Sequence, residues 1–334
     1  MKYTLLILVS MLSMACGTSN LHLTKGNPVN MPETYGPSIR ATDLKTHVYQ
    51  LASDAFEGRD TGEPGQQKAA AYLKDFYLKN QLLSPLGGGD YFQEIDPKFL
   101  QPGIKPSENV VAFIEGSSLP AEVLVISGHY DHIGIHDGAI YNGADDNASG
   151  TAAVMEIAQA FQQAVEAGHR PLRSILFLHL SAEEKGLLGS KYYVSAPIFP
   201  LENTIADLNI DMVGRIDKAH QKRPNYIYLI GSDKLSKDLH QLSEKANKQF
   251  VGLDLDYTYN KENDPNRFYY RSDHYNFAKH NIPVIFYFNG THQDYHRPTD
   301  TPDKIHYELL AKRARLVFYT AWELANRPKR IRVD

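Results

Sequence analysis

Cysteine is nearly absent from this sequence. Cys16 is the one cysteine among 334 residues, which excludes a framework of disulfide bonds within the chain. A surplus of basic residues is also lacking, because the formal net charge is −4. Without a basic stripe to meet a phosphate backbone, a nucleic-acid-binding function is disfavoured. The one basic cluster, residues 327–332, is interpreted as a solvated terminus. Low-complexity runs and solenoid-type repeats are absent, so the composition is that of a globular protein.

Long apolar segments are scarce as well. The apolar run of residues 5–12 follows Lys2 and leads into the small residues 13–16, and it is too short to span a bilayer comfortably. This order is typical of a secretory signal. Cys16, directly behind the run, resembles the lipidation site of bacterial lipoproteins. We therefore expect an exported protein in the periplasm or outer membrane, lipid-anchored at Cys16, with residues 1–16 as the signal segment.

The rest of the chain is expected to form a tether and one domain. Residues 17–40 are polar and rich in proline, glycine and asparagine, which is typical of a tether. Residues 41–330 alternate between strand and helix patterns. The expected strands cover residues 110–115, 122–127, 173–180, 205–212, 226–230 and 283–288. The expected helices cover residues 66–80, 149–167, 234–248 and 304–325. This alternation predicts an α/β fold with a mostly parallel, mixed central sheet and helices on both faces.

Metal-binding residue types follow several of the expected strands, either at the strand end or in the loop beyond it. They are His129, Asp145, the pair Glu183 and Glu184, Asp211 and His296. Loops at the carboxyl ends of parallel strands carry function, and imidazole with carboxylate favours zinc over calcium or magnesium. Two histidines and three carboxylates exceed the needs of one catalytic zinc. One bridging carboxylate would let them serve two metals about 3.5–4 Å apart.

Five motifs in order carry a family resemblance: GHYDH, NGADDNASG, SAEEKGLLGS, NIDMVGR and YHRPTDT. From about residue 51 to the final helix, the chain resembles the secreted bacterial leucyl aminopeptidases. Their superfamily also includes glutamate carboxypeptidase, the transferrin receptor and the glutaminyl cyclases. The resemblance implies a zinc-exopeptidase (phosphorylase/hydrolase-like) fold, two zinc ions, and hydrolysis of peptides that have a free N-terminus. Residues 41–330 would then be a single catalytic domain.

The resemblance also implies roles for individual residues. His129 and Asp211 would bind one zinc ion, Glu184 and His296 the other, and Asp145 would bridge them. The family's bridging aspartate is followed by a cis peptide bond, which predicts one between Asp145 and Asp146.

Further roles concern proton transfer and orientation. Glu183 matches the general base, Asp131 matches the carboxylate that orients His129, and Tyr269 falls where some members carry a tyrosine that stabilises the oxyanion. Neighbouring side chains past a strand diverge, so one of Glu183 and Glu184 can ligate a metal while the other transfers a proton.

Other histidines are expected to lack direct roles: His132, His136, His179 and His292. His274 is expected to support the site without ligating. Three rival functions stay open. A glutaminyl cyclase usually works with one zinc, a carboxypeptidase needs arginines such as Arg215 or Arg271 to bind a substrate carboxylate, and a binding protein should have lost metal ligands.

Overall fold

The computed structural model describes residues 31–334. The expected signal segment, Cys16 and residues 17–30 of the expected tether lie outside the described residues. Within residues 31–334, no helix combines the length and apolar character needed to cross a membrane.

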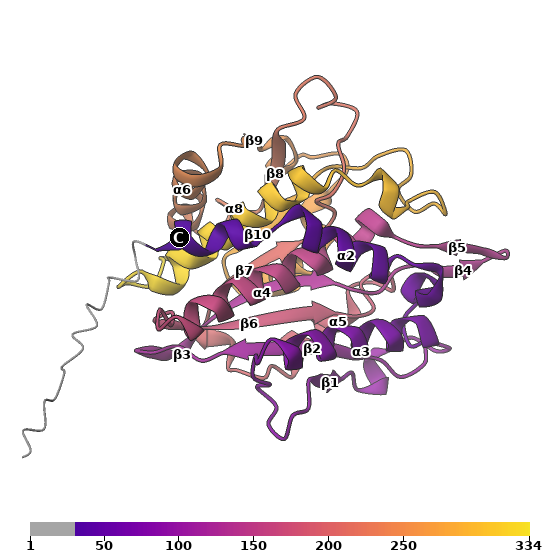
Figure 1. Ribbon diagram of the computed structural model, residues 1–334, viewed down its shortest axis with the longest axis horizontal. Helices are drawn as coiled ribbons and strands as arrows, with labels where there is room; N and C mark the ends of the chain where they lie inside the picture. The colour runs from indigo at the N-terminus through magenta and orange to yellow at the C-terminus, as the bar shows by residue number, and fades with distance from the viewer. Residues whose placement is uncertain (1–30) are drawn as a thin grey trace, which may run out of the picture.

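An eight-stranded mixed sheet forms the centre of the structure (Figure 1). In spatial order its strands are β1 (Phe92–Glu94), β2 (Glu108–Ile114), β6 (Arg173–Leu180), β3 (Leu119–His129), β7 (Thr204–Ile210), β10 (Val284–Phe288), β8 (Tyr226–Ile230) and β9 (Asp254–Asp256). The four central strands, β6, β3, β7 and β10, run parallel, whereas β2 and β8 pair with them antiparallel. The mostly parallel mixed sheet predicted from the sequence is therefore confirmed, and its central strands end at one common edge.

Helices cover both faces of the sheet, as the α/β prediction requires. One face carries α2 (Ala41–Leu51), α3 (Pro64–Lys79), α4 (Gly150–Glu166), α6 (Lys237–Ala246) and α8 (Tyr307–Asn326). The other face carries α5 (Leu188–Ser195) and α7 (His274–Ala278). A hairpin of β4 (Gly134–His136) and β5 (Ala139–Tyr141) projects beyond the carboxyl ends of the central strands (Figure 1). The sequence patterns did not predict α2, α5 or this hairpin.

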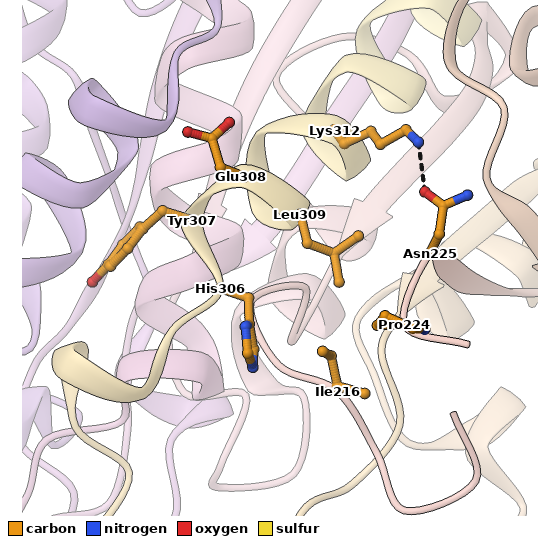
Figure 2. A pocket seen from close by; sticks show the side chains of 8 residues that line it. All are labelled: Ile216, Pro224, Asn225, His306, Tyr307, Glu308, Leu309 and Lys312. Atoms are coloured by element: carbon orange, nitrogen blue, oxygen red, sulfur yellow. Dashed lines mark hydrogen bonds between the residues drawn. The ribbon is translucent and has the colours of Figure 1, made fainter. Parts of the chain in front are cut away.

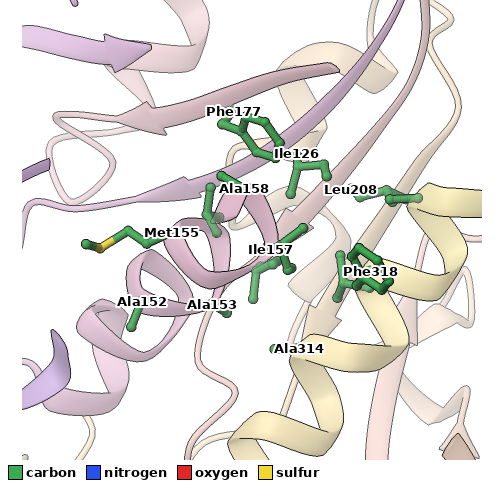
Figure 3. Packing of buried hydrophobic residues seen from close by; sticks show 14 of the residues in the cluster. Ile126, Ala152, Ala153, Met155, Ile157, Ala158, Phe177, Leu208, Ala314 and Phe318 are labelled. Carbon is green, nitrogen blue, oxygen red and sulfur yellow. The ribbon is translucent and has the colours of Figure 1, made fainter. Parts of the chain in front are cut away.

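The central strands are apolar on both faces because both faces are covered. In β3, Leu124 and Ile126 belong to the core under α4 and α8, whereas Val123 and Val125 belong to the core on the α5 side. This two-residue alternation is the geometry of a strand. Figure 3 shows α4 lying against Ile126 and the side chain of Phe177 from β6, with α8 beside it. Because helices cover both faces of the sheet, the sequences of these strands are continuous hydrophobic runs.

Part of the segment expected to be a tether packs on the domain. Residues 32–38, which were expected in the tether, form α1 (Pro32–Tyr35) and a short following turn, η2 (Gly36–Ser38). The Tyr35 ring stacks on Trp322 of α8 with centroids 5.7 Å apart, and Ile39 is fully buried. Removing these apolar side chains from water stabilises the segment on the core.

Asp207 is a carboxylate buried within β7. Its Oδ1 accepts a hydrogen bond of 2.6 Å from the Ser127 hydroxyl, whereas its Oδ2 has no partner in the part of the chain that the structure describes. Burial raises the pKa of Asp207 to about 8. The folded protein then holds this proton more tightly than the unfolded chain does. The free energy of unfolding should therefore fall as the pH rises from about 4 to about 8.

We expect the neutral variant Asp207→Asn to be more stable than the wild type at pH 8, by on the order of 1–3 kcal/mol. Near pH 4 the difference should be small, because the wild-type carboxyl is then protonated in the folded state and about half protonated in the unfolded state. Denaturant unfolding at the two pH values measures both differences. A variant less stable than the wild type at pH 8 would refute this account.

Candidate metal centre

Side chains from separate strands meet at the carboxyl ends of the central sheet. His129 is the last residue of β3, and Asp211 follows directly after the neighbouring strand β7. His129 Nε2 lies 3.3 Å from Asp211 Oδ1 and 3.3 Å from Asp146 Oδ1. Asp146 belongs to the turn η5 (Ala144–Ser149) that leads into α4. His129, Asp146 and Asp211 thus form a first group of side chains that can hold a metal ion.

A second group shares Asp146. Its Oδ2 lies 3.0 Å from His296 Nε2, and this nitrogen lies 3.3 Å from Glu184 Oε2. His132 Nδ1 is 2.9 Å from Glu184 Oε1 and 3.8 Å from Asp146 Oδ2. Asp146 therefore presents one carboxylate oxygen to each group, which is the arrangement that a carboxylate bridging two metals requires.

Asp145, expected in the bridging position, is engaged elsewhere. Its Oδ1 accepts a 2.7 Å hydrogen bond from the Gly214 backbone N–H. Its Oδ2 lies 3.0 Å from the Asn289 amide nitrogen and 3.1 Å from His292 Nε2. With both oxygens occupied, Asp145 holds the turn in place, and Asp146, not Asp145, lies between the two groups.

The predicted cis peptide bond between Asp145 and Asp146 is also wrong. The cis bond lies one residue further on, between Asp146 and Asn147. The Asn147 side chain links the ends of two strands to the turn. Its amide donates to the backbone oxygens of His129 (3.2 Å) and Ile210 (2.9 Å), and its Oδ1 accepts from the Met212 N–H (3.1 Å).

The two groups fit a pair of metal ions by the chemistry of their donors. His129 Nε2 is buried and has no hydrogen-bond partner among residues 31–334, although it faces two carboxylates. A buried polar atom without a partner is costly, and a metal ion between these groups would satisfy it. Imidazole nitrogens combined with carboxylate oxygens suit zinc.

Contacts with neighbouring residues orient the side chains that can hold a metal ion. His129 Nδ1 lies 3.1 Å from the backbone oxygen of Asp131 and 3.7 Å from its carboxylate Oδ1. The expected partner of His129 is thus adjacent, but its backbone oxygen is nearer than its carboxylate. That carboxylate accepts hydrogen bonds from the Glu183 N–H (3.1 Å) and the Thr61 hydroxyl (2.9 Å). Asp131 therefore ties the end of β3 to the loop that carries Glu183.

Glu183 lines a pocket against the two groups, together with Asp146, Asp211, Met212, Phe268, Arg271, Phe286, Phe288, Thr291, Tyr295 and His296. No hydrogen bond within residues 31–334 uses the Glu183 carboxylate. Burial, with the nearby charges of Glu184 and Asp211, raises the pKa of Glu183 well above its usual range. A buried carboxyl group with a raised pKa beside a metal-binding site is suited to general acid–base chemistry.

Tyr295, and not the predicted Tyr269, is the tyrosine in this pocket. Its ring stacks on His296 with centroids 3.9 Å apart, and its hydroxyl lies 3.4 Å from Arg271 Nη2. The Tyr269 ring packs against Gly231 and lies 5.0 Å from Lys234 Nζ, outside the pocket lining. The sequence did carry a signal for Tyr295, because it precedes His296 directly in the motif YHRPTDT.

The remaining histidines have different surroundings in the structure. His132 was expected to lack a direct role, yet it contacts Glu184 and belongs to the second group. His179 is a core residue 2.6 Å from the Tyr77 hydroxyl, and His292 contacts Asp145. His274 is buried and stacks on Phe286, so it supports the wall of the pocket.

Asp300 and Arg215 form a support that the sequence patterns did not reveal. Asp300 Oδ2 accepts hydrogen bonds from the backbone N–H groups of Asp145 (2.9 Å) and Asp146 (3.1 Å). Its Oδ1 lies 3.6 Å from Arg215 Nη1, and Arg215 Nη2 donates to Asp294 at 2.8 Å. The loop that carries His296 therefore also fixes the backbone of the Asp146 turn.

A larger hollow of about 620 Å³ lies elsewhere, at the start of α8. Figure 2 shows its lining, in which Lys312 bonds to Asn225 and no two carboxylates or histidines converge. The metal-binding residue types gather at the ends of the central strands instead, so we place the candidate functional site there.

Known proteins with similar sequences match parts of this chain. A probable zinc metalloprotease of Pyrenophora tritici-repentis is 40% identical over 110 residues, which cover 32% of this chain and 22% of that protein. Leupeptin-inactivating enzyme 1 of Streptomyces exfoliatus is 31% identical over 188 residues, covering 53% of this chain and 37% of that protein. The chain thus spans well under half the length of these relatives.

Among solved structures, the LapA aminopeptidase of Legionella pneumophila shares the fold. Its TM-score is 0.69 at 21% identity, and the alignment covers 89% of this chain and 75% of that one. Residues 109–321 match the family described as peptidase family M28. This range is more than half of the chain and contains both metal-binding groups from His129 to His296. The chain therefore belongs to peptidase family M28.

Proposed function

We propose that this protein is a zinc-dependent aminopeptidase that hydrolyses the N-terminal peptide bond of peptides. One observation supports the proposal most. Two groups of histidine and carboxylate side chains share Asp146, and the carboxylate of Glu183, which no residue in the described part of the chain engages, stands beside them. Shared-carboxylate sites of this kind are typical of two-metal hydrolases.

Each side chain has a role in the proposal. His129 and Asp211 would hold one zinc ion, Glu184 and His296 would hold the other, and Asp146 would be shared between them. Zinc supplies Lewis acidity there, which lowers the pKa of a water molecule and polarises the substrate carbonyl.

The remaining chemistry falls to side chains in the pocket. Glu183 takes a proton from the attacking water. Tyr295 donates a hydrogen bond toward the carbonyl oxygen as negative charge develops on it. Tyr295 takes this role instead of Tyr269 because its ring stacks on His296 and lines the pocket.

The charge around the pocket favours an aminopeptidase over a carboxypeptidase. Asp146, Glu183 and Asp211 line it. Glu183 is the one of these three carboxylates that the proposal does not assign to zinc, and a substrate α-ammonium group is attracted to a carboxylate of this kind. Arg215, one of the two arginines considered for a carboxypeptidase, is occupied by Asp294 at 2.8 Å. Arg271, the other, lines the pocket without a carboxylate partner in residues 31–334, so the arginines alone do not decide between the two activities. We also propose export to the periplasm or outer membrane with a lipid anchor at Cys16, on the sequence pattern of residues 2–16.

Removal of metal is the direct test of this function. The purified protein is expected to hydrolyse leucine p-nitroanilide, to lose nearly all of this activity after incubation with a chelator, and to regain it when zinc is added, because the hydrolysis depends on Lewis acidity. The measurement is the release of nitroaniline, with the zinc content determined in parallel.

The matched control is the N-acetylated anilide, which lacks the α-ammonium group and should not be cleaved. Full activity after complete removal of metal would overturn the proposal. Release of ammonia from peptides with N-terminal glutamine, without anilide cleavage, would instead identify a cyclase.

A further inference from the structure

Arg271 is the one lysine or arginine that lines the pocket beside the metal-binding groups. Its side chain is exposed to solvent. The guanidinium carbon lies 5.0 Å from the centre of the Phe268 ring, and Nη2 lies 3.4 Å from the Tyr295 hydroxyl. These two aromatic neighbours hold the positive group at the wall of the pocket, next to the tyrosine that stacks on His296.

Arg271 has no acidic partner of its own. Within residues 31–334, no carboxylate oxygen lies within 4.0 Å of its guanidinium, whereas three other cations are paired with aspartates. Arg215 pairs with Asp294 at 2.8 Å, Lys304 with Asp294 at 2.8 Å, and Lys185 with Asp60 at 2.6 Å. The guanidinium of Arg271 is therefore available for an anion that enters the pocket.

The chemistry of that anion follows from the donors. A guanidinium presents two parallel N–H groups that match the two oxygens of a carboxylate, and Arg271 Nη2 lies 3.4 Å from the Tyr295 hydroxyl, at the wall of the pocket. We propose that Arg271 binds a carboxylate group of the substrate, next to the bond that is cleaved. This inference rests on the proposed aminopeptidase function and adds a substrate class to it.

Two parts of a peptide could supply this carboxylate. One is the C-terminal carboxylate of a dipeptide, which lies one residue beyond the scissile bond. The other is the acidic side chain of an N-terminal glutamate. For each source, a charged substrate can be compared with a neutral analogue that differs only in the carboxylate. The two comparisons show which of the two carboxylates Arg271 binds.

The experiment compares the wild type with Arg271→Met. Two ratios of kcat/KM are measured, for Leu-Leu against Leu-Leu-amide and for glutamate p-nitroanilide against glutamine p-nitroanilide. Loss of a charge-assisted hydrogen bond changes binding by roughly 10- to 100-fold. We expect one of the two ratios to fall by about this factor in Arg271→Met, and that ratio identifies the source. Arg271→Lys keeps the positive charge but lacks the planar guanidinium, so it should retain part of the preference for the charged substrate.

Arg267→Met is the matched control. It removes the same charge from the same loop, but Arg267 lies over Tyr270 at 4.9 Å and does not line the pocket, so both of its ratios should equal those of the wild type. If both ratios in Arg271→Met stay within twofold of the wild type while anilides are still cleaved, the inference fails and the aminopeptidase function stands. If the wild type cleaves none of the four substrates, both fail.

Discussion

Replacement of Glu183 by glutamine is expected to lower kcat by roughly 10²- to 10⁴-fold while both zinc ions stay bound. The amide has the size of the carboxylate but cannot accept a proton. The Glu183 carboxylate makes no hydrogen bond within residues 31–334, and the metal-binding groups are made of other residues. The change should therefore remove proton transfer and leave the site otherwise intact. Initial rates on leucine p-nitroanilide, with zinc content from elemental analysis, measure both effects.

Glu184→Gln is the matched control, because it is the same change one residue along the chain. Glu184 accepts contacts from His132 at 2.9 Å and from His296 at 3.3 Å. Although burial opposes it, the hydrogen bonds from His132 and His296 lower the pKa of Glu184 to about 2. This carboxylate is thus held as an anion, and its loss should reduce zinc content. If Glu183→Gln lost zinc while Glu184→Gln kept it, the two roles would have to be exchanged.

Asp146→Asn is expected to weaken zinc binding strongly. Substitution of a residue that merely supports a metal ligand lowers metal affinity by roughly 10- to 100-fold, and we expect a larger loss here. The reason is that Asp146 places one oxygen 3.3 Å from His129 and the other 3.0 Å from His296. A neutral amide offers one oxygen in place of two and carries no charge. Zinc titration by calorimetry, after removal of bound metal, gives the stoichiometry and the affinity. We expect fewer than two zinc ions per chain at concentrations that saturate the wild type.

The neighbouring change Asp145→Asn distinguishes a bridging carboxylate from one that holds the turn. Asp145 accepts hydrogen bonds from Gly214 and Asn289 and contacts His292, so its loss should lower thermal stability more than zinc stoichiometry. Two zinc ions per chain in Asp146→Asn, together with depleted zinc in Asp145→Asn, would restore the bridge to Asp145.

The choice between these two aspartates shows where local sequence stops being informative. Both precede α4 in the same short motif, and both are fully or almost fully buried. Consecutive side chains in a turn diverge, so only one of them can face the strand ends. The Asp145 carboxylate is held by Gly214, Asn289 and His292, which come from distant segments of the chain, and Asp146 is the residue that faces the strand ends.

The tyrosines and arginines of the pocket make the same point. Tyr269 and Tyr295 are both plausible oxyanion donors by position, but only Tyr295 stacks on His296. Arg215 and Arg271 are both cationic, but within residues 31–334 Arg215 is paired with Asp294 whereas Arg271 has no carboxylate partner. Side-chain partners contributed by distant loops decide these alternatives, and no local pattern encodes them.

The sequence by itself determined the alternating strands and helices, the mostly parallel sheet and the placement of metal-binding residue types after the strands. It could do so because buried parallel strands need continuous apolar runs, and because the carboxyl ends of such strands meet at one edge. Tertiary structure alone decided the packing of residues 32–38 on the core, the position of Asp146 between the two groups, the contact of His132 with Glu184 and the lack of a carboxylate partner for Arg271 within residues 31–334. Each of these depends on which distant groups supply hydrogen bonds, charge or apolar cover, and such partners are fixed only once the chain has packed.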